Sequence, residues 1–181
     1  MNRRGFLLTG LGLGVLASTS PAQAAIAYPP VPSAYRIAAR VHRVPPTLLF
    51  AIALQESVLR IDGRHLPYPW TLNVEGRGER FKTYRAALVR LEALLDQGVT
   101  SVDCGAMQVN WRYHADKLRS PLLALNPWRN LEAGAQILRE RFDETPDWRI
   151  ATGRYHSPGN AGRARSYAAR VFARIPRIRH A

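Results

Sequence analysis

The sequence predicts one mainly helical domain with a small strand-like flap. Apolar residues recur at intervals of three and four along most of the chain, which is the spacing of amphipathic helices. Residues 61–82 break this pattern with prolines, aromatic residues and a glycine-rich turn, which favours two short strands or an irregular flap. A chain of 181 residues without internal repeats has room for one domain with a sizeable core.

An export signal is predicted over residues 1–24. Arg3 and Arg4 provide its charged beginning, residues 6–17 its apolar stretch, and residues 22–24 a small–x–small cleavage site. The apolar stretch is too short to anchor stably in a bilayer. The two arginines resemble a twin-arginine signal, which exports folded proteins, and an ordinary secretory signal is the alternative. We therefore expect cleavage near Ala24, a periplasmic location, and contact with the membrane only through export.

The strongly positive net charge favours a negatively charged partner. The formal net charge is +13, and nearly all of the positive charge is arginine. Such a surface suits an acidic polymer, anionic lipid or nucleic acid, and the export signal argues against nucleic acid. A compositional preference for arginine is the alternative explanation. The single cysteine, Cys104, cannot form an internal disulfide and is expected to be a small buried residue.

The first two helices follow a proline-rich lead-in over residues 25–32. Ser33 is predicted to cap a helix over residues 34–43. The next helix starts at Pro45 and Pro46, because proline is tolerated in the first helical turn. This second helix is an apolar run that ends in Glu56.

Glu56 is the candidate general acid of this helix. It shares a stripe with Leu49, Ile52 and Ala53, which we expect to face the core. Partial burial of a carboxylate raises its pKa, and a raised pKa suits a general acid at neutral pH. The alternative is a glutamate at the helix edge that only caps the helix or forms a salt bridge.

The later elements are also mainly helical. Thr83 is predicted to cap a helix over residues 84–97, which ends at Gly98. A short apolar–polar stretch, residues 105–110, precedes a helical turn, and Asn126 or Asn130 then begins a helix that ends near Phe142. Further helices are expected over residues 148–155 and from Asn160 onward, where the last one is basic and amphipathic. We place the domain over residues 33–175 and a basic tail over residues 176–181.

The arginines of this last helix have no acidic residue after Asp147 to balance them. They could dock on acidic glycan polymers, anionic lipid or a secretion partner. A solvated helix face is the alternative.

Four short motifs occur in a fixed order: Glu-Ser at 56–57, Gly-Ala-Met-Gln-Val-Asn at 105–110, Asn-Leu-Glu-Ala-Gly at 130–134, and Tyr-His-Ser-Pro-Gly at 155–159. In this order they resemble the soluble-lytic-transglycosylase-like (SLT) family, and the match covers most of residues 34–172. The resemblance implies the helical fold of the lysozyme superfamily, with the flap as its small β part.

The chain departs from the family pattern in two places. The segment between Ser57 and Gly105 is long, as in family members associated with conjugation and type IV secretion, so proteins of such an apparatus are candidate partners. His156 stands where the family often has asparagine, which leaves the role of this position open.

The resemblance implies action on the glycan strands of peptidoglycan, between N-acetylmuramic acid and N-acetylglucosamine. Glu56 would first protonate the glycosidic oxygen and then deprotonate the muramic 6-hydroxyl, which closes a 1,6-anhydro ring. One carboxylate then suffices, whereas ordinary glycosidases use two. The alternatives are a goose-type-lysozyme-like hydrolase and a non-catalytic basic module that binds peptidoglycan or a secretion partner. Asp103 is the candidate second carboxylate, and a solvated surface aspartate is its alternative reading.

Substrate contacts are expected from residues of the same motifs. Gly105 would let the backbone approach a sugar, Gln108 would supply an amide, and Met107 would offer an apolar surface. The resemblance also matches Tyr155 to a family tyrosine near the catalytic glutamate, where its hydroxyl can orient the acid. The expected substrate-binding residues are Ser57, Gly105, Met107, Gln108, Asn110, Tyr155 and His156, with Tyr68 and Trp70 as weaker candidates for the groove wall. The remaining histidines lack ligand spacing, so no metal or other cofactor is expected.

Overall fold

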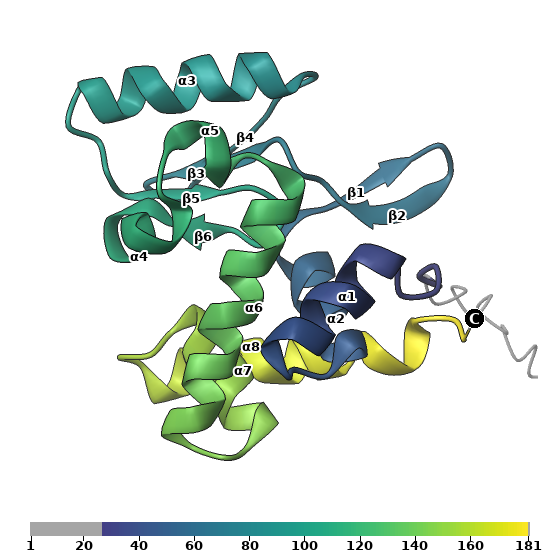
Figure 1. The fold of residues 1–181 in the computed structure, drawn as a ribbon. Helices are drawn as coiled ribbons and strands as arrows, with labels where there is room; N and C mark the ends of the chain where they lie inside the picture. The colour runs from purple at the N-terminus through teal and green to yellow at the C-terminus, as the bar shows by residue number, and fades with distance from the viewer. Residues whose placement is uncertain (1–26, 181) are drawn as a thin grey trace, which may run out of the picture.

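The computed structural model describes residues 27–180 (Figure 1). The mainly helical class with a small β part is confirmed. The helices are α1 (Ser33–His42), α2 (Pro46–Ser57), α3 (Tyr84–Asp96), α4 (Trp111–Leu118), α5 (Pro121–Ala124), α6 (Pro127–Glu144), α7 (Trp148–His156), α8 (Ala161–Phe172) and the 3-10 helix η1 (Ile175–Arg177). The strands are β1 (Val58–Ile61), β2 (Arg64–Pro67), β3 (Thr71–Val74), β4 (Arg77–Arg80), β5 (Val102–Cys104) and β6 (Val109–Asn110).

The elements form two lobes that α6 connects (Figure 1). One lobe contains the strands together with α3, α4 and α5. The other contains α1, α2, α7 and α8, and α6 runs from the first lobe into the second. The candidate catalytic residue lies at the end of α2, where the two lobes meet.

The β part is larger than the predicted flap. Strands β1 and β2 form a separate hairpin, and β4, β3, β5 and β6 form an antiparallel sheet in that order. Strand β6 lies within the stretch over residues 105–110, for which no strand was predicted, and β5 lies just before that stretch, where no element was predicted. Strands β5 and β6 are only three and two residues long, too short for alternation along the sequence to reveal them. Cys104 lies in β5 and is fully buried, as expected.

Helix α2 is the central helix of the molecule. It packs against α1, α8 and β2, and every residue from Leu48 to Leu54 is buried. Leu49, Ile52 and Ala53 face the core as expected, and the other sides of this part of the helix are enclosed as well. Glu56 is half-buried in the last turn, where the helix leaves the core.

The predicted helix starts are right for two of three caps. The Thr83 side chain accepts a hydrogen bond from the Ala86 N–H, and Asn126 caps α6, which continues to Glu144. Ser33 does not cap α1: it is already the first helical residue, and the carbonyl of Pro32 accepts the first bond, from Arg36 N–H.

The two ends of the described chain lie together. Tyr28 forms a parallel β-bridge with Ile178, and both side chains are buried. The expected tail, residues 176–181, thus begins inside η1 and continues into this contact. The predicted export signal, residues 1–24, lies outside the described residues.

Within residues 27–180, no single helix has both the length and the apolar character needed to cross a membrane. Helices α1 and α2 meet those criteria only as a pair, bent by 117° at the break between them.

Candidate active site

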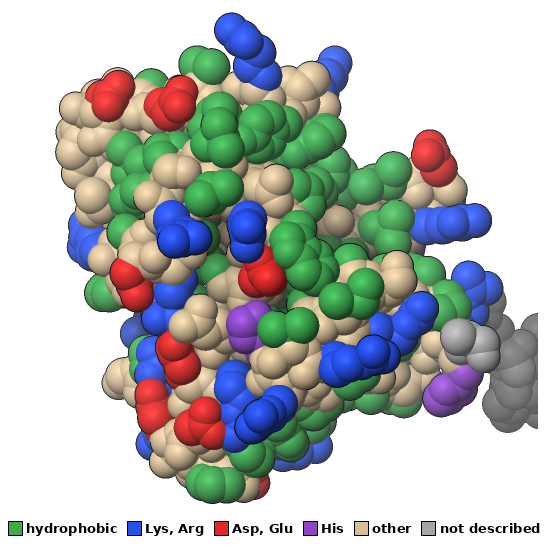
Figure 2. Space-filling model, in the orientation of Figure 1, with side chains coloured by type: hydrophobic (Ala, Val, Ile, Leu, Met, Phe, Trp, Pro, Cys, Tyr) green, Lys and Arg blue, Asp and Glu red, His purple; other side chains and the backbone are tan. Residues whose placement is uncertain are grey.

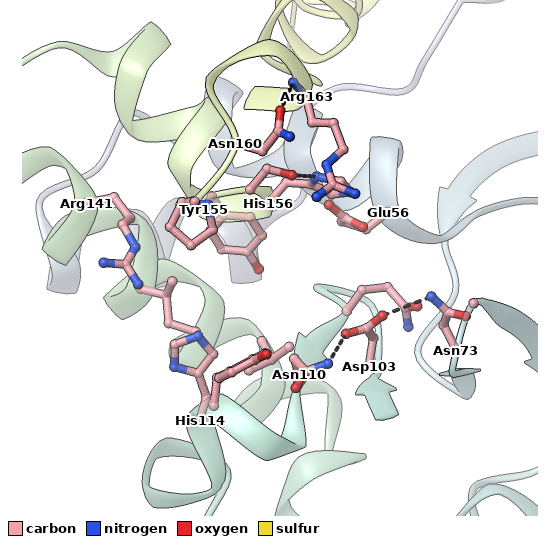
Figure 3. A pocket seen from close by; sticks show the side chains of 18 of the residues that line it. Glu56, Asn73, Asp103, Asn110, His114, Arg141, Tyr155, His156, Asn160 and Arg163 are labelled. Atoms are coloured by element: carbon pink, nitrogen blue, oxygen red, sulfur yellow. Dashed lines mark hydrogen bonds between the residues drawn. The ribbon is translucent and has the colours of Figure 1, made fainter. Parts of the chain in front are cut away.

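A groove of about 1010 Å³ lies between the four-stranded sheet and the helices of the other lobe (Figure 3). Its walls come from the end of α2, strands β3 to β6, helices α4, α6 and α7, and the turn that precedes α8. Lys and Arg side chains gather on both sides of a central hollow, in which acidic and histidine side chains are visible (Figure 2). Glu56 lines this groove, as its candidate role requires.

The carboxyl group of Glu56 is tuned to exchange a proton near neutral pH. Burial raises its pKa to about 7, and the negative charge of Asp103 acts in the same direction. A hydrogen bond from the Tyr167 hydroxyl to Glu56 Oε1 and the positive charge of Arg170 act in the opposite direction. Glu56 can therefore donate a proton to a ligand and later take one back.

Tyr167 is the partner of Glu56 that the sequence analysis missed. It lies in the middle of α8 and is 1% exposed. The His156 ring stacks on it with centroids 4.4 Å apart and planes 16° apart. Burial and the nearby Arg170 lower the pKa of His156, which favours a neutral ring at pH 7. The arginines of α8 predict a basic outer face, and no pattern in the sequence shows that Tyr167, on the buried face of the same helix, contacts Glu56.

Tyr155 lines the groove, but its hydroxyl does not orient Glu56. It donates instead to the backbone carbonyl of Met107, at 2.7 Å. The expectation that this tyrosine orients the acid is wrong, because that place is taken by Tyr167. Tyr155 instead ties α7 to the loop between β5 and β6.

Three expected contact residues are buried in or beside this loop. Ser57, Gly105 and Met107 are buried and are not among the residues that line the groove. The Ser57 hydroxyl donates to the carbonyl of Ala106 at 2.8 Å and accepts from the Tyr68 N–H at 3.2 Å. These three residues therefore contribute to the structure of the loop and do not face the groove.

Asn130, on α6, is the buried anchor of the same loop. Its Oδ1 accepts from the Met107 N–H at 2.9 Å, and its Nδ2 donates to the carbonyls of Cys104 and Ala124 at 2.8 and 3.0 Å. Gly105 has a φ of +77°, and a Cβ there would lie 2.4 Å from Asn130 Cγ. The glycine is thus required by its backbone conformation and by this close packing.

The other expected residues do line the groove. Gln108, Asn110 and His156 are all part of its wall. Gln108 is fixed by its Nε2, which donates to the carbonyl of Gly105 at 2.9 Å and to that of Thr71 at 3.3 Å. Tyr68 and Trp70 are not among the lining residues, and they pack edge to face on one another, with ring centroids 5.9 Å apart.

Asp103 is not a solvated surface residue. It lines the groove, and its two carboxylate oxygens accept hydrogen bonds from the side-chain amides of Asn73, at 2.9 Å, and Asn110, at 2.7 Å. Burial raises its pKa, and the two amide donors oppose that effect. Asn73 was not expected in the site, because nothing in the sequence shows that β3 pairs with β5.

No cluster of three or more His, Cys, Asp or Glu side chains suited to a metal ion occurs in the described part of the chain. The groove thus presents a half-buried acid, a second carboxylate held by amides, and arginines on its rim (Figure 3).

Comparison with known proteins identifies the family. The family model described as "Transglycosylase SLT domain" matches residues 33–172, which include every element from α1 to α8. No curated protein and no solved structure matches the chain significantly. Since the family model spans most of the chain, the protein belongs to the transglycosylase SLT domain family.

Proposed function

We propose that this protein is a lytic transglycosylase that cuts peptidoglycan glycan strands between N-acetylmuramic acid and N-acetylglucosamine. The observation that carries the proposal is the state of Glu56: a half-buried carboxyl in a groove, with a pKa of about 7 and a tyrosine hydroxyl on one oxygen. An acid whose pKa lies near the working pH serves as both proton donor and acceptor.

The reaction needs only this one carboxyl group. Protonated Glu56 donates its proton to the glycosidic oxygen, the bond from that oxygen to the anomeric carbon breaks, and the departing sugar gains a hydroxyl. The muramic 6-hydroxyl then bonds to the anomeric carbon and gives its proton to Glu56. The product carries a 1,6-anhydro ring, no water is consumed, and Glu56 is again protonated. Tyr167 keeps the carboxyl oriented through both transfers.

The cellular setting belongs to the same proposal. The export signal predicted over residues 1–24 supports a periplasmic enzyme. The long segment between Ser57 and Gly105, which forms β1 to β5 and α3, supports local wall opening for a transenvelope apparatus. Its exposed hairpin β1–β2 and helix α3 are the surfaces that such an apparatus could contact (Figure 1).

Mass spectrometry of the soluble products from purified peptidoglycan tests the reaction. We expect anhydro-muropeptides from the wild type, none from Glu56→Gln, and unchanged products from Glu92→Gln, a matched substitution at an exposed position on α3. Reducing-end products would show a hydrolase. An absence of products from a folded wild-type protein would leave the non-catalytic binding module. Either result would overturn the proposal.

A further inference from the structure

Asn73, Asp103 and Asn110 form a row across the sheet. In the strand register, Asn73 on β3 lies opposite Asp103 on β5, and Asp103 lies opposite Asn110 on β6. Side chains at directly opposed positions point to the same face of a sheet. All three line the groove, and Figure 3 shows Asp103 across the open space from Glu56, with an amide on each side of it.

The side-chain amides of Asn73 and Asn110 donate to Asp103 but leave their own oxygens without a hydrogen-bond partner. Each donates its Nδ2–H to one oxygen of Asp103, and the Oδ1 of each is buried with no hydrogen-bond partner. A buried acceptor without a partner is unfavourable, and native structures keep few of them. Rotating either amide to relieve this would place its oxygen against the carboxylate. The two amides therefore fix the orientation of Asp103, and each leaves one buried oxygen unpaired.

Asp103 is held as an acceptor without a permanent cation. No Lys or Arg side chain within residues 27–180 forms an ion pair with it. A carboxylate has about four lone-pair sites, and the two amides use one on each oxygen. The remaining sites can accept hydrogen bonds from a ligand. The groove wall opposite Glu56 thus contains an oriented carboxylate, Asp103, that can accept further hydrogen bonds.

We propose that Asp103 binds a hydrogen-bond donor on a sugar next to the bond that Glu56 cuts, either a ring hydroxyl or an acetamido N–H. Asn73 and Asn110 are positioning residues that hold the carboxylate in place for this contact. The inference rests on the proposed function, because it takes a glycan as the ligand. A hydrogen bond from a neutral donor to a charged acceptor is stronger than one between neutral groups, so Asp103 contributes to affinity more than an amide would.

The first test compares kinetics on peptidoglycan. Asp103→Asn keeps the side-chain shape and removes the charge, and we expect KM to rise about tenfold with a smaller change in kcat, as for loss of a charge-assisted hydrogen bond. The control Asp116→Asn changes an exposed aspartate of α4 in the same way and should leave both constants unchanged. An unchanged KM would overturn the proposal. So would a fall in kcat of about 100-fold at constant KM, which would assign Asp103 to the chemical step.

The positioning role of Asn73 requires a double-mutant cycle. If Asn73 acts through Asp103, the double variant Asn73→Ala/Asp103→Asn should bind no more weakly than Asp103→Asn alone. Additive losses would show that Asn73 contacts the sugar directly. Thermal unfolding of each variant separates weaker binding from a loss of folded protein.

Binding measurements identify the donor and keep the proposal independent of turnover. Calorimetric titration uses N-acetylglucosamine oligomers and glucose oligomers. A loss of affinity in Asp103→Asn for the first set alone indicates an acetamido N–H, and a loss for both sets indicates a hydroxyl. A wild type that binds these oligomers but cuts no peptidoglycan would refute the enzyme and leave the Asp103 contact standing. A wild type that binds neither oligomer would overturn the contact.

Discussion

At the scale of single residues, the site depends on how closely opposing effects on Glu56 are balanced. Burial and Asp103 raise the pKa of Glu56, whereas Tyr167 and Arg170 lower it, and the result is about 7. Burial alone would hold the group protonated, so that it could not act as a base in the second step. The two opposing partners both lie on α8. The helix that looks from the sequence like a basic surface element therefore sets the acidity of the groove.

Replacing Tyr167 with phenylalanine tests this balance. The tyrosine hydrogen bond lowers the pKa of Glu56, so Tyr167→Phe should raise that pKa above about 7. Glycosidic protonation requires the acid form, so the limb on which activity falls with rising pH should move to higher pH. The measurement is the pH dependence of kcat/KM on peptidoglycan.

Tyr84→Phe is the matched control, because the Tyr84 hydroxyl donates to the carbonyl of Leu122 and the residue is not among those that line the groove. Its pH profile should coincide with that of the wild type. A limb that moves to lower pH in Tyr167→Phe would contradict the assigned role of the hydroxyl.

Gly105, in the loop between β5 and β6, has no room for a side chain. An alanine there would adopt an unfavourable φ of +77°, and its Cβ would overlap the side chain of Asn130. We expect Gly105→Ala to lower the free energy of unfolding by about 3 kcal/mol, measured by urea denaturation. For comparison, Gly159→Ala meets no atom within 4 Å and should change stability by less than about 0.5 kcal/mol. Equal effects of the two substitutions would show that this packing is not required.

At the scale of secondary structure, the sequence predicted the long helices well and the sheet poorly. Caps such as Thr83 and Asn126 leave a local signature, and α3 and α6 begin where those residues predict. The pairing of β3 with β5 joins residues thirty positions apart, and no local pattern encodes it. For this reason the pattern of its own helix was enough to predict Glu56 as the acid. The contacts of Asn73 with Asp103 and of Tyr167 with Glu56 could not be predicted, because they join distant parts of the chain.

The contact between the two ends of the described chain is a further element that the sequence did not indicate. Tyr28 N–H donates to the carbonyl of Arg177 at 2.8 Å, Arg179 N–H donates to the carbonyl of Tyr28 at 3.1 Å, and Ile178 is 6% exposed. Helix η1, which includes Arg177, is also in contact with α2. Ile178→Ala should therefore lower the free energy of unfolding by about 2 to 3 kcal/mol in urea denaturation.

His180→Ala, an exposed position two residues further on, is the control and should be neutral. If residues 176–180 instead behaved as an independent tail, both substitutions would leave stability unchanged.

At the scale of the whole molecule, the positive charges and the acidic groups lie in different places and are suited to different parts of the substrate. The chain carries a net charge of +13, and arginines such as Arg80 and Arg163 reach the rim of the groove. The inner wall, by contrast, presents Glu56 and Asp103 (Figure 3). Peptide-bearing glycan strands carry carboxylates, so the basic exterior attracts the polymer, while the uncharged sugar rings meet the acidic wall. Exposed charges act over a distance that salt shortens, whereas the hydrogen bonds of the inner wall depend little on salt.

This separation predicts two different responses to ionic strength. Raising NaCl from about 50 to about 500 mM shortens the Debye length from about 14 to about 4 Å, so KM for peptidoglycan should rise several-fold with kcat unchanged. Neutral N-acetylglucosamine oligomers lack the carboxylates, and their affinity, measured by calorimetric titration at the same two salt concentrations, should stay constant. An equal loss of affinity for the neutral oligomers would mean that salt acts on the inner wall itself. A KM that does not respond to salt would mean that the arginines are a compositional feature without a part in substrate capture.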